Sequence, residues 1–344
     1  MTSLTRLNRF GGAALAILAG AAIALTPIGL QAQPPAGGAQ APAGGGGRGP
    51  AAPHGPHEFM GATVQDAPGP LPDPSRIVLL LPNQIKWTGN KALVYGDPTK
   101  AGDPYGVIVK LAPGQFSTPH SIANDRWVYV VSGTLWVSGT NAAASYPVKA
   151  DNFITNVAKT SFVDGNRAGA TEPTVLMITG VGSPDNRIMS DYSTMTTVKV
   201  SDAAGAAPDT AKITITPVSL TGNQNLYGGG QGAQTEGTPY GVIQTWTPGR
   251  YSSPHYHPHP RYIYVLSGTW WATSSSLHDT RLTYPIPAGS FVQDLPKGIH
   301  WDGNRMGDPN TTRLYISGVA PASNVAVDED GKERAAPGGR GGYN

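Results

Sequence analysis

The chain has 344 residues, which is long enough for two domains of ordinary size, and a formal net charge of +2. It contains no cysteine, which excludes disulfides, thiolate metal ligands and a lipoprotein anchor. The 45 glycines, 32 prolines and only 13% charged residues favour short strands and turns over helices. Nothing in this balance indicates binding to nucleic acid or to an anionic membrane.

The first 32 residues have the pattern of a secretory signal peptide. Arg6 and Arg9 precede an apolar stretch over residues 10–30, and small residues around Ala32 offer a cleavage site. We therefore expect a periplasmic or secreted protein with no membrane contact after cleavage. The alternative is a membrane anchor that is retained, which Pro27 and the following Gly/Pro-rich sequence disfavour.

Residues 33–75 are rich in Ala, Gly, Pro and Gln, a composition typical of a disordered linker. His54 and His57 lie in this stretch, where weak metal scavenging is the minor alternative to an incidental role. A disordered tail is expected over residues 328–344, which end in a Gly/Arg-rich sequence.

An internal repeat fills the sequence between these ends. The segment 113–120 (PGQFSTPH) matches 248–255 (PGRYSSPH), and 127–134 matches 262–269, both at an offset of 135 residues. Each copy contains short β-rich runs that are separated by Gly, Pro, Asn and Asp clusters. The pattern predicts two tandem all-β domains, over residues 76–200 and 211–322, each a sandwich or barrel.

Histidines concentrate in the second copy. His255, His257 and His259 alternate, so an extended backbone would turn them to one face, and His300 lies on a later strand. Imidazoles that converge from two strands form a divalent metal site, and we assign His255, His257 and His300 as the ligands. His259 is bracketed by two prolines, which favours a loop near the cavity mouth over a fourth ligand.

At these residues the second copy resembles the cupin superfamily. The first cupin motif corresponds to Gly249, His255, His257, Arg261 and Gly268, and the second to Gly289, Pro296, Gly298, His300 and Asn304. The resemblance implies a bicupin with two antiparallel jelly-roll barrels. The chain is similar in particular to bacterial exported cupin-domain proteins of unassigned activity. This similarity therefore implies no particular reaction.

Arg261 is the main departure from the cupin pattern, since cupins often have a glutamate ligand at this position. A guanidinium does not ligate a divalent cation. Arg261 therefore either grips an anion in the cavity or pairs with Asp294 or Asp302. Asp294 has three open roles, as a metal ligand, a general base or the partner of Arg261, and we take Arg261 and Asp294 as catalytic candidates.

The first copy is predicted to be a degenerate cupin domain. It keeps His120 but has Ile122 and Phe162 where the second copy has His257 and His300. It also has Asn156 where the second copy has Asp294. A single histidine does not make a tight metal site, so we expect apolar side chains to fill this barrel.

The predicted function is a metal-dependent enzyme, with an oxygenase on a small organic molecule as the first hypothesis. A three-His site leaves open coordination positions that suit Fe²⁺, Zn²⁺ or Mn²⁺. The alternatives are a non-catalytic cupin that binds a metal or small ligand, and a structural protein with a residual histidine set. The sequence leaves the metal, the substrate and a homo-oligomeric state open.

Overall fold

The computed structural model describes residues 68–194 and 198–334. Within these ranges the chain consists of antiparallel strands and three short 3-10 turns, with no α-helix. Accordingly, none of the described residues forms a helix that is long and apolar enough to cross a membrane. The predicted signal peptide and the linker up to residue 67 lie outside the described residues.

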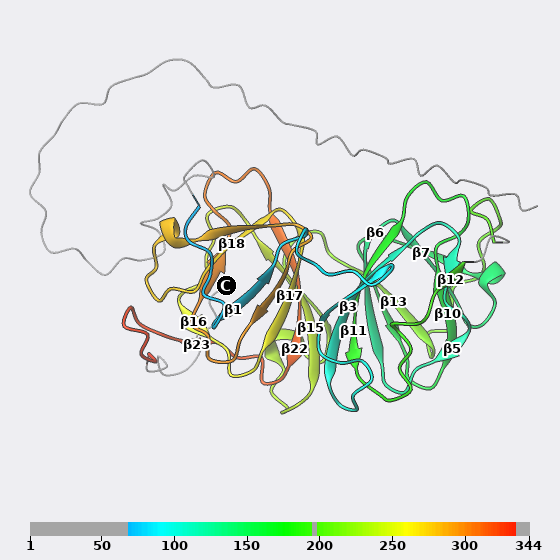
Figure 1. Ribbon diagram of the computed structural model, residues 1–344, viewed down its shortest axis with the longest axis horizontal. Coiled ribbons are helices and arrows are strands. Elements are labelled where there is room, and N and C mark those ends of the chain that lie inside the picture. The colour runs from blue at the N-terminus through cyan, green and yellow to red at the C-terminus, as the bar shows by residue number, and fades with distance from the viewer. Residues whose placement is uncertain (1–67, 195–197, 335–344) are drawn as a thin grey trace, which may run out of the picture. The chain divides into compact units, whose positions relative to one another are not determined.

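The first barrel is formed by two facing sheets (Figure 1). One sheet has the order β13 (Ile213–Pro217), β9 (Asn152–Asn156), β6 (Arg126–Ser132), β11 (Thr174–Val181), β3 (Pro104–Leu111), β2 (Lys91–Tyr95). The other has the order β12 (Ser193–Thr194), β4 (Gln115–Phe116), β10 (Ser161–Gly165), β7 (Thr134–Ser138), β8 (Tyr146–Lys149), with β5 (His120–Ser121) also paired to β10. Alternate apolar residues of both sheets form the core between them.

The second barrel repeats this plan. Its larger sheet has the order β1 (Ile77–Leu80), β20 (Phe291–Asp294), β17 (Arg261–Ser267), β22 (Thr312–Val319), β15 (Pro239–Trp246), β14 (Gln224–Tyr227). Opposite it are β19 (Tyr284–Pro287), β18 (Thr269–Thr273) and β21 (Trp301–Gly303), and a separate pair of β16 (His255–Tyr256) and β23 (Val325–Ala326). The short turns are η1 (Ala142–Ala144), η2 (Gly230–Gly232) and η3 (Thr280–Leu282). The prediction of two all-β barrels is confirmed.

The two barrels exchange one strand each. The strand β1 precedes the first barrel in sequence but pairs with β20 of the second, with Ile77 opposite Asp294. In the same way β13, which lies in the predicted range of the second domain, pairs with β9 of the first, with Ile213 opposite Asn156. The barrels therefore do not separate at the predicted boundaries 76–200 and 211–322. Alternating apolar residues predict that a segment is a strand, but they do not predict which other strand it pairs with.

Two segments that were predicted to be disordered are ordered where the structure describes them. The Gly69 amide donates to the Thr283 carbonyl (2.8 Å) and the Asp73 amide to Ser274 Oγ (2.8 Å), so residues 68–75 lie on the second barrel. After β23, the Asp328 amide donates to the Lys332 carbonyl (2.9 Å), which closes a turn. The rest of the predicted tail, residues 335–344, lies outside the described residues.

A third apolar core joins the two barrels. It contains tyrosines of both larger sheets, and the rings of Tyr95 and Tyr262 stack at 3.6 Å. Hydroxyl groups in this layer are paired across it, as in Thr179 Oγ1 with Tyr315 OH (2.7 Å) and Tyr95 OH with Ser317 Oγ (3.0 Å). Burial of aromatic area with satisfied hydroxyls stabilises such a layer. The exchanged strands and this core make the pair of barrels one folding unit.

We expect Ile77→Ala to destabilise the second barrel, because Ile77 is only 1% exposed and lies in its core. The loss from a large-to-small change at a buried isoleucine is about 2–5 kcal/mol. Leu93→Ala is the matched control, since Leu93 is 43% exposed, and its effect should stay within about 0.5 kcal/mol. Urea unfolding followed by tryptophan fluorescence measures both, and equal effects would show that β1 does not belong to the second barrel.

Candidate metal centre

Three histidines of the second barrel are brought together by its backbone pairing. His255 lies on β16, and His300 immediately precedes β21. The two residues form an antiparallel bridge in which the amide of each donates to the carbonyl of the other at 2.9 Å. His257 follows two residues after His255 and is turned to the same side. The predicted convergence of two strands is therefore present in the structure.

The imidazoles of His255, His257 and His300 meet in a closed interior. One ring nitrogen of each lies within 4.8 Å of the others, and the ring centroids are 4.5–5.1 Å apart. The exposed fractions of the three residues are only 4%, 2% and 0%. Among the described residues, this is the one group of three histidines, cysteines or carboxylates close enough to share an ion.

Backbone carbonyls set the tautomer of each ring. The Nδ1 atoms of His255, His257 and His300 lie 2.7, 3.1 and 2.8 Å from carbonyl oxygens. Those oxygens belong to Ser253, Ser323 and Gly298. A carbonyl only accepts, so each Nδ1 carries the hydrogen and each Nε2 keeps a lone pair. All three Nε2 atoms are buried and have no hydrogen-bond partner among the described residues.

The electrostatics keep the rings of His255 and His257 neutral. Burial lowers the pKa of His255 well below its usual value, and nearby His300 and Arg261 lower it further. Burial also lowers the pKa of His257 well below its usual value, with the Arg261 charge as the next cause. Neutral imidazoles with inward lone pairs and outward N–H groups are the form that binds divalent first-row metals. The residues present therefore fit such an ion.

Arg261 and Asp294 form a buried ion pair beside the imidazoles. Both Nε and Nη2 of Arg261 donate to Oδ2 of Asp294, at 3.0 and 2.7 Å. The two residues are cross-strand partners on β17 and β20. Asp294 Oδ2 also lies 3.4 Å from His300 Nε2 and 3.9 Å from His257 Nε2. The sequence analysis named Asp294 and Asp302 as possible partners of Arg261, and the structure shows that Arg261 bonds Asp294.

Asp302 is a second buried carboxylate near this pair. Its Oδ2 lies 3.9 Å from His300 Nε2 and 4.0 Å from Arg261 Nη2, both longer than the corresponding contacts of Asp294. Burial is the largest cause that raises the pKa of Asp302 above its usual value. Asp302 lies on β21, and the sequence offered it only as a possible partner of Arg261.

His259 lies outside the group of three. Its Nε2 faces Glu236 Oε1 at 3.4 Å, and 30% of its side chain is exposed. The structure thus places His259 toward solvent, as the prolines on both sides of it indicated.

A C-terminal segment over residues 321–334, here called the strap, packs against the edge of the site. Its strand β23 pairs with β16 and sets Ala326 opposite His255, and the Val327 amide donates to the Pro254 carbonyl at 3.0 Å. The strap also supplies the Ser323 carbonyl that holds His257. Sequence reasoning missed this contact, because a backbone carbonyl has no residue signature.

The equivalent region of the first barrel is filled. His120 Nδ1 lies 2.7 Å from the Thr118 carbonyl, as His255 does from Ser253. Phe162, which takes the place of His300, is fully buried and packs edge-on against the His120 ring. Ile122, Met189 and Tyr192 pack against the same core. These side chains occupy the space that the second barrel gives to its imidazoles.

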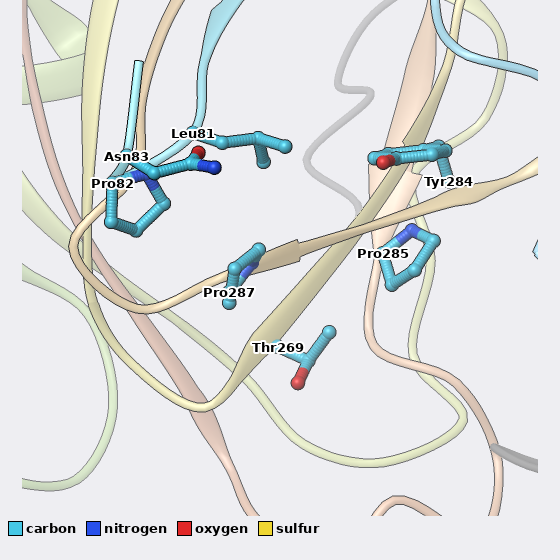
Figure 2. A pocket seen from close by; sticks show the side chains of 7 residues that line it. All are labelled: Leu81, Pro82, Asn83, Thr269, Tyr284, Pro285 and Pro287. Atoms are coloured by element: carbon cyan, nitrogen blue, oxygen red, sulfur yellow. The ribbon is translucent and has the colours of Figure 1, made fainter. Parts of the chain in front are cut away.

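A separate hollow of about 500 Å³ lies on the second barrel (Figure 2). Figure 2 shows prolines and one tyrosine ring around it, and the lining residues are Leu81, Pro82, Asn83, Thr269, Tyr284, Pro285 and Pro287. It shares no residue with the histidine group and offers little polar chemistry.

No family model matches the chain, and no curated protein matches it. Solved structures do resemble it. A cupin 2 conserved barrel domain protein from Leptotrichia buccalis has 13% identity and a TM-score of 0.45, covering 71% of this chain and 96% of that one. Oxalate decarboxylase from Lactobacillus farciminis, in a formate complex, has 14% identity and a TM-score of 0.47, covering 75% and 90%.

A third similar structure is salicylate 1,2-dioxygenase from Pseudoaminobacter salicylatoxidans, as an adduct with gentisate. It has 11% identity and a TM-score of 0.45, covering 67% of this chain and 73% of that one. At these identities and scores, none of the three proteins informs the metal, substrate or reaction of this chain. The strand order and the histidine group themselves show two β-barrels, one of which brings three imidazoles together.

The two depressed histidine pKa values predict an acid-sensitive metal-free protein. Above pH of about 6.5, His255 and His257 are neutral in both the folded and unfolded chain and contribute no pH dependence. Below it, the unfolded chain takes up protons that the folded chain excludes. Each of the two histidines then lowers the free energy of unfolding by about 1.4 kcal/mol for every pH unit below about 6.5.

Urea unfolding of EDTA-treated protein between pH 7.5 and 5.5 measures this dependence. The control is the double variant His255→Ala/His257→Ala, whose stability should fall less steeply below about pH 6.5. Other titrating groups are common to both proteins, so identical slopes would show that these imidazoles do not titrate as their burial implies.

Proposed function

We propose that the second barrel binds one divalent transition metal through His255, His257 and His300 and is a metal-dependent enzyme for a small organic molecule. One observation carries the proposal, namely three buried Nε2 lone pairs that converge without a partner while each Nδ1 is held by a carbonyl. Unpaired buried polar atoms are costly, and a metal ion satisfies all three at once.

Oxygenase chemistry is the first candidate reaction. A three-His set leaves coordination positions open for reactants, which is the feature of catalytic rather than structural metal sites. Bound Fe²⁺ would supply sites for substrate and O₂, bound Zn²⁺ a water of lowered pKa, and bound Mn²⁺ a Lewis acid for a small acid. The three imidazoles are buried, and the Arg261–Asp294 ion pair lies beside them as a polar group of fixed position.

A non-catalytic metal or small-ligand binding protein is the second candidate. Burial favours it, since the three imidazoles are only 0–4% exposed. Contact between a substrate and these imidazoles would require a movement of the segments around them. Product formation or O₂ consumption separates the enzyme from the binder.

Export is part of the proposal and rests on the sequence pattern of residues 1–32. In a periplasmic or secreted protein, Zn²⁺ and Mn²⁺ remain in their usual oxidation state more easily than Fe²⁺. Cell fractionation of the full chain beside a chain without residues 1–32 tests it. Recovery of both in the cytoplasm would contradict export.

The metal content of the purified, untagged chain tests the function. We expect about one ion per wild-type chain, and loss of that ion in His300→Ala, which removes one of three nitrogen ligands. His259→Ala is the matched control and should keep the ion, because His259 faces Glu236 instead. Elemental analysis measures all three, and the element found selects the reaction to assay.

Wild-type chain that stays metal-free after reconstitution with Fe²⁺, Mn²⁺ and Zn²⁺ would contradict the metalloenzyme. With metal bound, an oxygen electrode and product analysis on small aromatic and aliphatic acids separate the two candidates. Turnover that is lost in His300→Ala supports the enzyme, and bound metal without turnover leaves the binder.

A further inference from the structure

We propose that Asp294 is a fourth protein ligand of the metal in the second barrel, with Arg261 as the residue that positions its carboxylate. This inference rests on the proposed function. It assigns one of the three roles that the sequence left open to Asp294. The carboxylate enters the site from β20, one strand away from the position at which the resembling family often has a glutamate.

The first argument is distance. Donor atoms about 2.1 Å from a tetrahedral ion are about 3.4 Å apart. Asp294 Oδ2 lies 3.4 Å from His300 Nε2 and 3.9 Å from His257 Nε2. The carboxylate is therefore already at ligand-to-ligand separation from one imidazole and close to it from a second.

The second argument is hydrogen bonding. Asp294 is fully buried, and both of the Arg261 contacts go to its Oδ2. The other oxygen, Oδ1, is buried without a hydrogen-bond partner among the described residues. A buried carboxylate oxygen without a hydrogen-bond partner needs a cation or donor there. The unpaired Nε2 atoms of His300 and His257, which lie 3.4 and 3.9 Å from Oδ2, offer lone pairs only, so a cation shared with them would provide the partner that this carboxylate lacks.

The third argument is register. Arg261 and Asp294 lie directly opposite each other on β17 and β20. Cross-strand partners point to the same face with Cβ atoms about 4.5–5.5 Å apart. A carboxylate on β20 therefore reaches nearly the same space as one on β17. The planar guanidinium grips Oδ2 with two N–H groups, which fixes the carboxylate rotamer.

The first barrel provides an internal comparison. It shares an arginine and an aspartate with the second, and there Arg126 donates to Asp164 at 2.7 Å. If Arg261 needed only a partner, Asp302 would serve as Asp164 does. Instead Arg261 bonds Asp294 and leaves Asp302 at 4.0 Å.

The differences between the two copies are correlated. The copy with Ile122 and Phe162 in place of two imidazoles also has the neutral Asn156 in place of Asp294. Strand pairing confirms this correspondence, because Arg126 lies opposite Asn156 as Arg261 lies opposite Asp294. At this position of the strand pair, the copy with the histidine group has a carboxylate and the other copy has an amide.

The test compares metal affinity in Asp294→Asn, which introduces the side chain of the first barrel, with Asp302→Asn as the matched buried control. Zn²⁺ affinity is measured by competition with a chromophoric chelator, and the visible spectrum of the Co²⁺-loaded chain reports coordination. We expect Asp294→Asn to weaken Zn²⁺ binding by at least 10–100-fold, the range seen even for residues that contact a ligand. It should also change the Co²⁺ spectrum, and Asp302→Asn should have a clearly smaller effect on both.

Equal Zn²⁺ affinities and Co²⁺ spectra for wild type and Asp294→Asn would overturn this inference and leave the three-His site intact. Absence of Zn²⁺ and Co²⁺ binding by wild type would overturn the proposed function itself. If circular dichroism shows that Asp294→Asn does not fold, a crystal structure of the Zn²⁺-loaded wild-type chain decides. An Asp294 oxygen at about 2.0–2.2 Å from the ion supports the ligand, and a water between them overturns it.

Discussion

The second barrel is organised by the need to hold three imidazoles in a dry interior with their lone pairs facing one another. Each ring is fixed by a carbonyl from a different segment, namely the turn before β16, the turn before β21, and the strap. Without those carbonyls the Nδ1 hydrogens would be unpaired at a buried position, which costs free energy. The site is therefore complete only when the barrel has closed and the strap has docked.

Much of this arrangement can be predicted from the pattern of side chains along the sequence. The repeat, the alternating histidines and the later His300 were sufficient to predict two β-barrels and the histidine group, because strand periodicity fixes which side chains share a face. The Ser323 carbonyl, the strand β23 and the strand exchange were not predictable. Each depends on backbone groups, and the backbone has the same donors and acceptors at almost every residue.

Arg261 shows how much of a residue's role can be predicted from its type alone. The sequence excluded it as a ligand and offered two carboxylate partners, but only the register of β17 against β20 selects between them. The comparison of Asn156 with Asp294 was already visible in the repeat. Its meaning emerges only with the structure, since Arg126 donates to Asp164 where its cross-strand partner is the neutral Asn156. Comparison of the two copies thus separates features that both barrels share, such as the arginine–aspartate pair, from features found only beside the histidine group, such as Asp294.

The strand exchange links the degenerate first barrel structurally to the barrel that holds the histidine group. β1, the first strand of the described chain (Figure 1), pairs with β20 and sets Ile77 directly opposite Asp294. A segment cut at residue 211 would keep every histidine of the group but would lose the strand that borders the carboxylate. It would also expose the tyrosines that the two larger sheets now bury against each other. Without β1, which precedes the first barrel in the chain, β20 would become a sheet edge beside the histidine group.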